Sequence, residues 1–254
     1  MTEAREVTGM VLLAAPVGDF DKRLVLLTRE YGKITVFARG ARKPNSAFLA
    51  VANPFVFGTF FIYEGRTSYQ LKSARIKNYF TELAKKQPGV YYGFYFLELA
   101  SYYYREYMDA TEMLNLLYVT LRALTVGKMD NRLIRCVFEL RAVLLNGECP
   151  DFFSCQECCN SEQLFWFYPA KSGVVCESCH KKTKGYAIKM DASVLYTVQY
   201  IVTSKLQKLY TFTVTEEVLE ILCKMMKEYM KGQVDRELKS LEVLRVMELS
   251  LIHI

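Results

Sequence analysis

Histidine is almost absent from this chain, which has only two in 254 residues. The sequence also lacks the G-x-x-x-x-G-K-[ST] and G-x-G-x-x-G patterns that bind phosphates, and the G-x-S-x-G pattern of serine hydrolases. Histidine is the most common general acid or base, and the glycine patterns belong to nucleotide-dependent enzymes. We therefore expect a protein that is not an enzyme.

Long apolar runs and an export signal are also missing. The most apolar stretch, residues 90–104, contains Glu98, is rich in tyrosine and is too short to span a bilayer. The first ten residues, MTEAREVTGM, have no basic segment followed by an apolar one. We expect a cytoplasmic protein with no membrane partner.

The positive charge is confined to one part of the chain. The net charge is +6, and residues 1–80 carry twelve Lys and Arg against six Asp and Glu, which accounts for the whole excess. A basic module joined to a neutral remainder is typical of proteins that bind polyanions such as nucleic acids. A solvated basic surface without a ligand would give the same count.

Residues 7–80 have the pattern of β-strands. Apolar or alternating runs at 7–17, 22–28, 33–38, 54–63 and 68–80 are separated by turn-forming residues, and a basic loop follows the third run. Five short strands favour a small barrel of the OB type, which would form a nucleic-acid-binding domain at 1–80. An SH3-like barrel or an open meander fits the pattern nearly as well.

From residue 81 the apolar period becomes helical. We expect a helical domain whose first part covers 81–149 and whose second part covers 188–248, with a small module inserted at 150–187. The fold class is thus α+β with several domains.

The last six residues, 249–254, have the sequence LSLIHI and follow a helical segment without a cap or a turn. They match the translation of a transposon end used in preparing sequencing libraries. We expect this tail, with its His253, to be non-native.

The inserted module contains the most specific pattern in the chain, C-x2-C-x17-C-x2-C. It is formed by Cys155, Cys158, Cys176 and Cys179. Two such pairs supply the four thiolates of a tetrahedral structural zinc site, and we expect one Zn²⁺ that holds an insert without a core of its own. Cys159 and His180 are spare ligands beside the second and fourth cysteines, so the ligand set stays open. Disulfides and an iron–sulfur cluster are weaker alternatives.

The segment 33–43 suggests where a nucleic acid would bind. On a strand, Lys33, Phe37 and Arg39 share one face, and an aromatic ring between cations can stack on a base while the cations contact phosphates. Arg42 and Lys43 extend the charge into a loop that we expect to be mobile. An inward-facing Phe37 is nearly as compatible with the pattern.

Several segments together resemble the RecO family of bacterial DNA repair and recombination proteins. They are GDFDKRLVLLTREYGKITVFARGARKPNS, PFVFGTFFIYEGR, the cysteine pair after LLNGECPDFFSC, and LKSLEVL. The resemblance runs from about Thr8 to about Leu244 and implies an N-terminal OB-fold, a helical domain and a zinc module. The zinc segment of the family usually has glycine after its second cysteine, where this chain has Cys159.

The resemblance also implies a function. It is that of a mediator that binds single- and double-stranded DNA, anneals complementary strands and, with RecR, helps to load RecA onto DNA coated by the single-strand DNA-binding protein (SSB). Its partners would be RecR, the acidic C-terminal tail of SSB and, indirectly, RecA, at the nucleoid. The candidate DNA-binding residues are Lys22, Arg23, Lys33, Phe37, Arg39, Arg42, Lys43 and Arg66.

Two other functions remain open at this point. A metal-dependent nuclease would use Asp19, Asp21 and neighbouring carboxylates, although both residues also suit a turn. A zinc-ribbon transcription or translation factor that binds RNA would show the same cysteine pattern.

Overall fold

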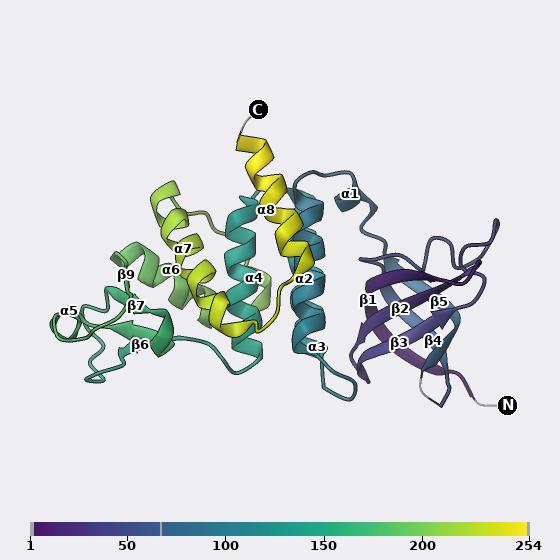
Figure 1. Cartoon of the computed structure of the whole chain (residues 1–254), viewed down its shortest axis with the longest axis horizontal. Helices are drawn as coiled ribbons and strands as arrows, with labels where there is room; N and C mark the ends of the chain where they lie inside the picture. The colour runs from purple at the N-terminus through teal and green to yellow at the C-terminus, as the bar shows by residue number, and fades with distance from the viewer. Residues whose placement is uncertain (1–2, 67, 253–254) are drawn as a thin grey trace. The chain divides into compact units, whose positions relative to one another are not determined.

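The computed structural model describes residues 3–66 and 68–252 (Figure 1). The chain forms two compact units. The first consists of Met1–Thr125 together with Leu238–Ile254, and the second of Val126–Glu237. Within the described residues, no helix is both long and apolar enough to cross a membrane.

The N-terminal part of the first unit is a closed five-stranded barrel, drawn in purple and blue in Figure 1. Its strands are β1 (Arg5–Val17), β2 (Asp21–Thr28), β3 (Gly32–Ala38), β4 (Phe57–Glu64) and β5 (Tyr69–Asn78). They close in the order β1-β2-β3-β5-β4, with β3 and β5 parallel and the other pairs antiparallel. The predicted five strands and the OB-type barrel are confirmed, and the open meander is excluded.

The alternation of apolar residues determines which side chains fill the barrel. Ile34, Val36 and Ala38 of β3 lie in the buried core, whereas Lys33, Thr35 and Phe37 between them do not. Successive side chains of a strand point to opposite sides, so Phe37 lies on the outer face. The inward-facing alternative is thereby excluded.

The basic loop after β3 is folded rather than mobile. Ala41, Val51 and Ala52 of the segment between β3 and β4 are buried in the barrel core. The Gly40 amide donates to Asp21 Oδ1 at 2.7 Å, and the Arg42 amide donates to the Phe20 carbonyl at 2.8 Å. The loop covers one end of the barrel. The polar sequence of residues 39–46 does not indicate this burial. The expectation that the loop is mobile is therefore wrong.

The first unit is completed by four helices. They are α1 (Thr81–Ala84), α2 (Gly89–Tyr103), α3 (Thr111–Val126) and α8 (Lys239–Ile252). α8 packs on α2, where Glu98 Oε2 accepts the Ser240 amide at 2.8 Å and Glu248 Oε1 accepts the Tyr92 hydroxyl at 2.5 Å. Within the predicted non-native tail, residues 253 and 254 lie outside the described residues.

The turn between β2 and β3 contacts the segment that joins α2 and α3. The Lys33 amide donates to the Arg105 carbonyl at 3.1 Å, and the Tyr107 amide donates to the Tyr31 carbonyl at 2.8 Å. Gly32 lies between them with a φ of 65°, in the left-handed region that favours glycine. The barrel and these helices are thus joined through backbone contacts.

The second unit combines three long helices with a small sheet. The helices are α4 (Asn131–Leu145), α6 (Ala192–Thr203) and α7 (Glu216–Gln233), and α4 packs on both others. The sheet has the order β6-β8-β7-β9, from β6 (Asp151–Cys155), β8 (Gly173–Val175), β7 (Trp166–Tyr168) and β9 (Ile188–Lys189). Short helical turns η1 (Pro169–Lys171), α5 (Glu177–His180) and η2 (Leu206–Lys208) connect these elements. The predicted boundaries at residues 80, 149 and 187 stay predictions.

The first turn of α4 provides a pH-dependent contribution to stability. Asp130 caps the helix by accepting the Arg132 amide at 2.8 Å, and the Arg132 side chain bridges Asp130 and Glu216. The hydrogen bonds from the Arg132 side chain lower the pKa of Asp130. A carboxyl group with a lowered pKa stabilises the fold above its unfolded pKa, and this stabilisation is lost as the pH falls through the folded value.

Asp130→Asn should therefore lower the free energy of unfolding at neutral pH, because asparagine keeps the cap and removes the charge. The difference between the variant and the wild type should disappear as the pH falls below about 4. Urea unfolding across this pH range measures it. A difference that is equal at all pH values would contradict the electrostatic assignment.

Candidate nucleic-acid interface and metal centre

The four cysteines of the predicted metal site lie together in the second unit. The Sγ atoms of Cys155, Cys158, Cys176 and Cys179 are all within 4.8 Å of one another. The Sγ atoms of Cys158 and Cys176 are 3.8 Å apart. Four sulfurs that surround a zinc ion at its usual bond length are separated by about 3.8 Å, so the arrangement fits a tetrahedral Zn²⁺.

Hydrogen bonds favour the thiolate form at two of the four cysteines. Burial would raise the pKa of Cys155, but the Cys176 and Glu157 amides donate to its sulfur at 3.3 and 3.5 Å, and the pKa is lowered overall. A hydrogen bond with the Ser178 hydroxyl and the amide of Cys179 lower the pKa of Cys176 to about 6. Hydrogen bonds with the other cysteines raise the pKa of Cys179 to about 12 and also raise that of Cys158. Thiolates are the form that binds metal, so Cys155 and Cys176 favour the binding form and the other two thiols would lose their protons as the ion binds.

The two spare ligands, Cys159 and His180, lie outside the four-cysteine cluster. His180 stacks on Trp166, with ring centroids 3.5 Å apart, and its Nδ1 atom is hydrogen-bonded to the Tyr168 hydroxyl at 2.8 Å. Cys159 is exposed, is not part of the cluster, and has a φ of 59°. The left-handed conformation explains why glycine suits this position.

The insert, which we expected to lack a core of its own, packs its sheet on α7. Phe152, Phe167 and Val174 of its sheet are buried, and the rings of Phe152 and Phe167 stack with centroids 5.8 Å apart. Phe167 also packs edge-on against Tyr229 of α7. The sequence did not indicate this core because its strands are very short and their apolar partners lie about sixty residues away on α7.

The outer face of the barrel carries part of the predicted DNA-binding set. Arg23 on β2 and Phe37 on β3 are cross-strand partners, and Phe37 pairs in turn with Gln70 on β5. Arg23 is exposed and Phe37 half-buried. The structure thus places a cation directly beside a half-buried aromatic side chain.

The folded loop brings more cations to the neighbouring end of the barrel. Arg39, Arg42 and Lys43 are exposed. The Arg42 guanidinium donates to the Gly18 carbonyl at 3.1 Å, and the Lys43 ammonium lies 5.4 Å from the centre of the Phe20 ring, which is half exposed. The loop therefore presents its charges in fixed positions next to an aromatic side chain.

Two predicted residues lie in different surroundings. The Lys22 ammonium donates to the Ala52 carbonyl at 2.8 Å and to Asn53 Oδ1 at 2.9 Å, and burial lowers its pKa. The Lys33 ammonium donates to the Ser101 carbonyl near the end of α2. Both side chains hold protein segments together, and their contact with DNA stays a prediction, as does that of the exposed Arg66.

The barrel cations are mostly not neutralised by acids. Arg5 pairs with Glu64. Within the described part of the chain, Arg23, Arg39, Arg42 and Lys43 form no ion pair, so their charge is available to a ligand.

The sequence interpretation missed a second group of cations. Lys72, Arg75 and Lys77 of β5 are exposed. Lys72 lies 5.4 Å from the centre of the Tyr63 ring, and Arg75 lies 5.8 Å from that of Phe61. The spacing of Arg75 and Lys77 on one strand face was a usable signal, but the aromatic partners are on β4 and become neighbours only through the strand register.

Asp19 and Asp21, the two acids that the nuclease hypothesis would use, have different surroundings. Asp21 accepts the Gly40 amide, whereas Asp19 lies exposed in the turn. Among the described residues, the four cysteines form the one group of three or more His, Cys, Asp or Glu side chains that could hold a metal ion.

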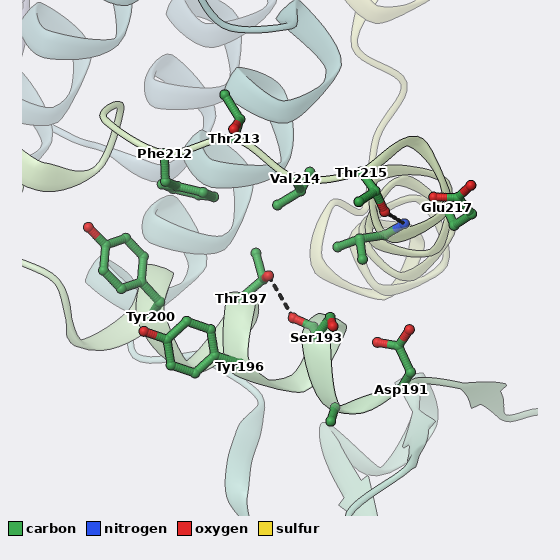
Figure 2. Close-up of a pocket in the computed structure, with 12 residues that line it drawn as sticks. Asp191, Ser193, Tyr196, Thr197, Tyr200, Phe212, Thr213, Val214, Thr215 and Glu217 are labelled. Atoms are coloured by element: carbon green, nitrogen blue, oxygen red, sulfur yellow. Dashed lines mark hydrogen bonds between the residues drawn. The ribbon is translucent and has the colours of Figure 1, made fainter.

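A pocket of about 960 Å³ lies between α6 and the start of α7. Figure 2 shows Tyr196, Tyr200 and Phe212 at one end of it and Asp191 and Glu217 at the other. The residues that line it include two acids and no Lys, Arg or His. This composition is unsuited to a polyanion, and the barrel remains the candidate interface.

Comparisons with known proteins agree with this architecture. Residues 1–80 match the family model for the recombination protein O N terminal, and residues 89–242 match that for the recombination protein O C terminal. Many curated relatives bear the name DNA repair protein RecO, and three of them serve as examples. The one from Alkaliphilus metalliredigens is 29% identical over 92% of this chain and 96% of its own length. That from Exiguobacterium sibiricum is 30% identical over 93% and 94%, and that from Acetivibrio thermocellus 25% over 96% and 97%.

The two family matches, together with a five-stranded barrel and a helical part whose small sheet carries a four-cysteine cluster, place the chain in a class of DNA repair and recombination proteins. The chain belongs to the RecO family, and the predicted resemblance is confirmed.

Proposed function

We propose that this protein is a recombination mediator that binds single- and double-stranded DNA, anneals complementary strands and, with RecR, helps to load RecA onto DNA coated by SSB. The observation that carries the proposal is the set of exposed, unpaired cations around Phe37 and Phe20 on the barrel. Cations that follow phosphates, combined with rings that stack on bases, bind nucleic acids without regard to sequence. Family membership supports the role in repair.

The proposal assigns the DNA contacts chiefly to Arg23, Phe37, Arg39, Arg42 and Lys43. Their position on one barrel face and on the loop beside it allows a strand to contact charge and ring together. Lys22 and Lys33 would act mainly by fixing the loop and the end of α2, because their ammonium groups donate to carbonyl oxygens. The Lys22 ammonium has three donors and uses two of them within the protein, so a phosphate contact from Lys22 remains part of the proposal.

A structural zinc ion completes the proposal. The four thiolates leave no open coordination position for a water molecule or a substrate, so the ion would hold β6, β8 and α5 together rather than perform chemistry. The protein would be non-enzymatic, would act in the cytoplasm at the nucleoid, and would recruit RecR and the acidic tail of SSB.

Replacing Arg39, Arg42 and Lys43 with alanine should weaken DNA binding irrespective of base sequence. Each lost phosphate contact lowers the salt slope by about 0.7 for single strands, so the triple variant should lose about 2 units of slope. Fluorescence anisotropy of labelled oligonucleotides across a range of salt concentrations measures both quantities.

A matched control is provided by three exposed lysines of the second unit, Lys205, Lys208 and Lys224. Their replacement with alanine changes the net charge by the same amount and should leave the slope nearly unchanged. Equal slopes in the wild type and the loop variant would refute the assignment of this face.

An annealing assay separates the proposal from the two alternatives. Complementary labelled strands incubated with the protein and Mg²⁺ should form duplex faster, with no new fragments. Fragments would favour the nuclease hypothesis, and a strong preference for RNA over DNA would favour the zinc-ribbon factor.

A further inference from the structure

The outer face of β4 and β5 has the same composition as the predicted interface. Phe61 and Tyr63 alternate with the core residues Phe60 and Ile62, so their rings lie on the outside of the barrel. Lys72 and Arg75 lie over these two rings. Within the described residues, neither cation has an acidic partner, and the same holds for Lys77.

This face is continuous with the one around Phe37. Phe37 on β3 pairs with Gln70 on β5, and Gln70 pairs with Tyr63 on β4. A row of outward side chains therefore runs from Arg23 through Phe37 and Gln70 to Tyr63. Because the barrel is closed through the β3–β5 pair, no gap in the sheet interrupts this row.

The dimensions suit a polymer rather than a small ligand. Three steps between neighbouring strands, from β2 to β4, cover about 14 Å, and the seven residues from Gln70 to Lys77 along β5 cover about 23 Å. Single barrels of this type contact about 4–16 nucleotides. At about 3.4 Å per nucleotide, the combined path of about 37 Å would hold about eleven nucleotides, which lies within that range.

We infer that the barrel has one extended track for single-stranded nucleic acid, which continues from Arg23 and Phe37 across Gln70 to Tyr63, Lys72, Phe61, Arg75 and Lys77. Unpaired bases would stack on the rings of β4, and the β5 cations would contact the phosphates. The inference rests on the proposed function and extends it, because it specifies an unpaired strand as the ligand of this second segment. Bases in a duplex are stacked on one another and cannot stack on exposed rings.

An acid also lies on this face. Glu6 on β1 is the cross-strand partner of Phe61 and is exposed. A carboxylate beside the track repels phosphate, so Glu6→Gln should tighten single-strand binding by about two-fold. This variant tests the track with a gain rather than a loss of binding.

The main experiment compares oligonucleotides of about 5 and about 15 nucleotides, which span the lower and upper parts of the known site sizes. For the wild type, affinity should rise with length. For Lys72→Ala/Arg75→Ala/Lys77→Ala the rise should be much smaller, and the salt slope with the longer strand should fall by about 2. The Lys205, Lys208 and Lys224 triple variant is the matched control.

A second pair of variants tests stacking. Tyr63→Leu keeps an apolar side chain but removes the ring, and should weaken binding of the longer single strand by about ten-fold while leaving duplex binding unchanged. Tyr63→Phe should bind like the wild type. Circular dichroism and thermal melting of each variant show that the barrel is folded.

The outcomes distinguish the inference from the proposal beneath it. If the wild type binds single strands and the loop variant loses binding, but the β5 variant keeps wild-type affinity and slope, the extended track is refuted and the proposed function stands. If the wild type shows no salt-dependent binding of any oligonucleotide, the proposed function itself fails.

Discussion

Cys155→Ser should abolish tight zinc binding and loosen the sheet of the second unit. Cys155 is almost completely buried and accepts two amide hydrogen bonds at its sulfur, so it is the most deeply embedded of the four ligands. Serine does not supply a thiolate, and three sulfurs leave the tetrahedral shell incomplete. Metal analysis of the purified variant should show that its zinc content falls from about one equivalent towards none.

The loss of stability should be large but smaller than in isolated zinc fingers, where metal binding contributes about 10–16 kcal/mol. The sheet keeps the stacked pair Phe152 and Phe167 and the contact of Phe167 with Tyr229. We therefore expect a lowered melting temperature, with α7 loosened, rather than a fully unfolded chain. Thermal melting followed at a helix-sensitive wavelength, with and without a chelator, measures this difference.

The control for this prediction is the neighbouring cysteine. Cys159→Gly should keep the zinc and raise the stability slightly, by about 1 kcal/mol, because glycine adopts a φ near 59° without strain. If Cys159→Gly released the metal while Cys155→Ser retained it, the ligand assignment would be wrong.

Gly32→Ala should destabilise the first unit severely. A Cβ atom at this position would lie 2.4 Å from the Arg105 carbonyl oxygen and 2.6 Å from that of Met108. Both are backbone atoms, which cannot rotate away as a flexible side chain would. The left-handed φ adds about 1–2 kcal/mol, and overpacking adds typically 1–3 kcal/mol, so a loss of about 3 kcal/mol is expected.

Gly18→Ala separates the two contributions. Gly18 also has a left-handed φ, of 54°, but nothing lies within 4 Å of the Cβ position. This variant should lose only the conformational part, about 1–2 kcal/mol. Urea unfolding of both variants gives the comparison, and equal losses would show that the contacts of Gly32 with residues 105–108 contribute nothing.

The barrel and the metal cluster were predictable because their patterns are local. Alternation within β3 places the side chains of Ile34 and Val36 inside the barrel and that of Phe37 outside. The two C-x2-C pairs are recognisable from their spacing alone as the ligands of one metal ion. The helical caps at Asp130, Asp191 and Thr215 are equally local, and each accepts a backbone amide at its helix start.

Features that depend on distant partners were not predictable. Lys33 belongs to the basic pattern of the sequence, but its ammonium group donates to Ser101, 68 positions away. Glu98 of α2 accepts a hydrogen bond from the Ser240 amide, 142 positions away. The apolar periodicity of either segment does not predict that contact. The rings of β4 likewise meet the cations of β5 only through a register that contains two irregularities.

The packing of α8 on α2 has a consequence for synthesis on the ribosome. The second unit is a single continuous stretch of chain, whereas the first contains an early and a late segment. As the polypeptide emerges, α2 exposes the surface that later receives α8, until residues beyond 238 have been released. The second unit can therefore fold before the first unit has received α8. If translation stopped within residues 126–237, the first unit would lack this helix and would remain incomplete.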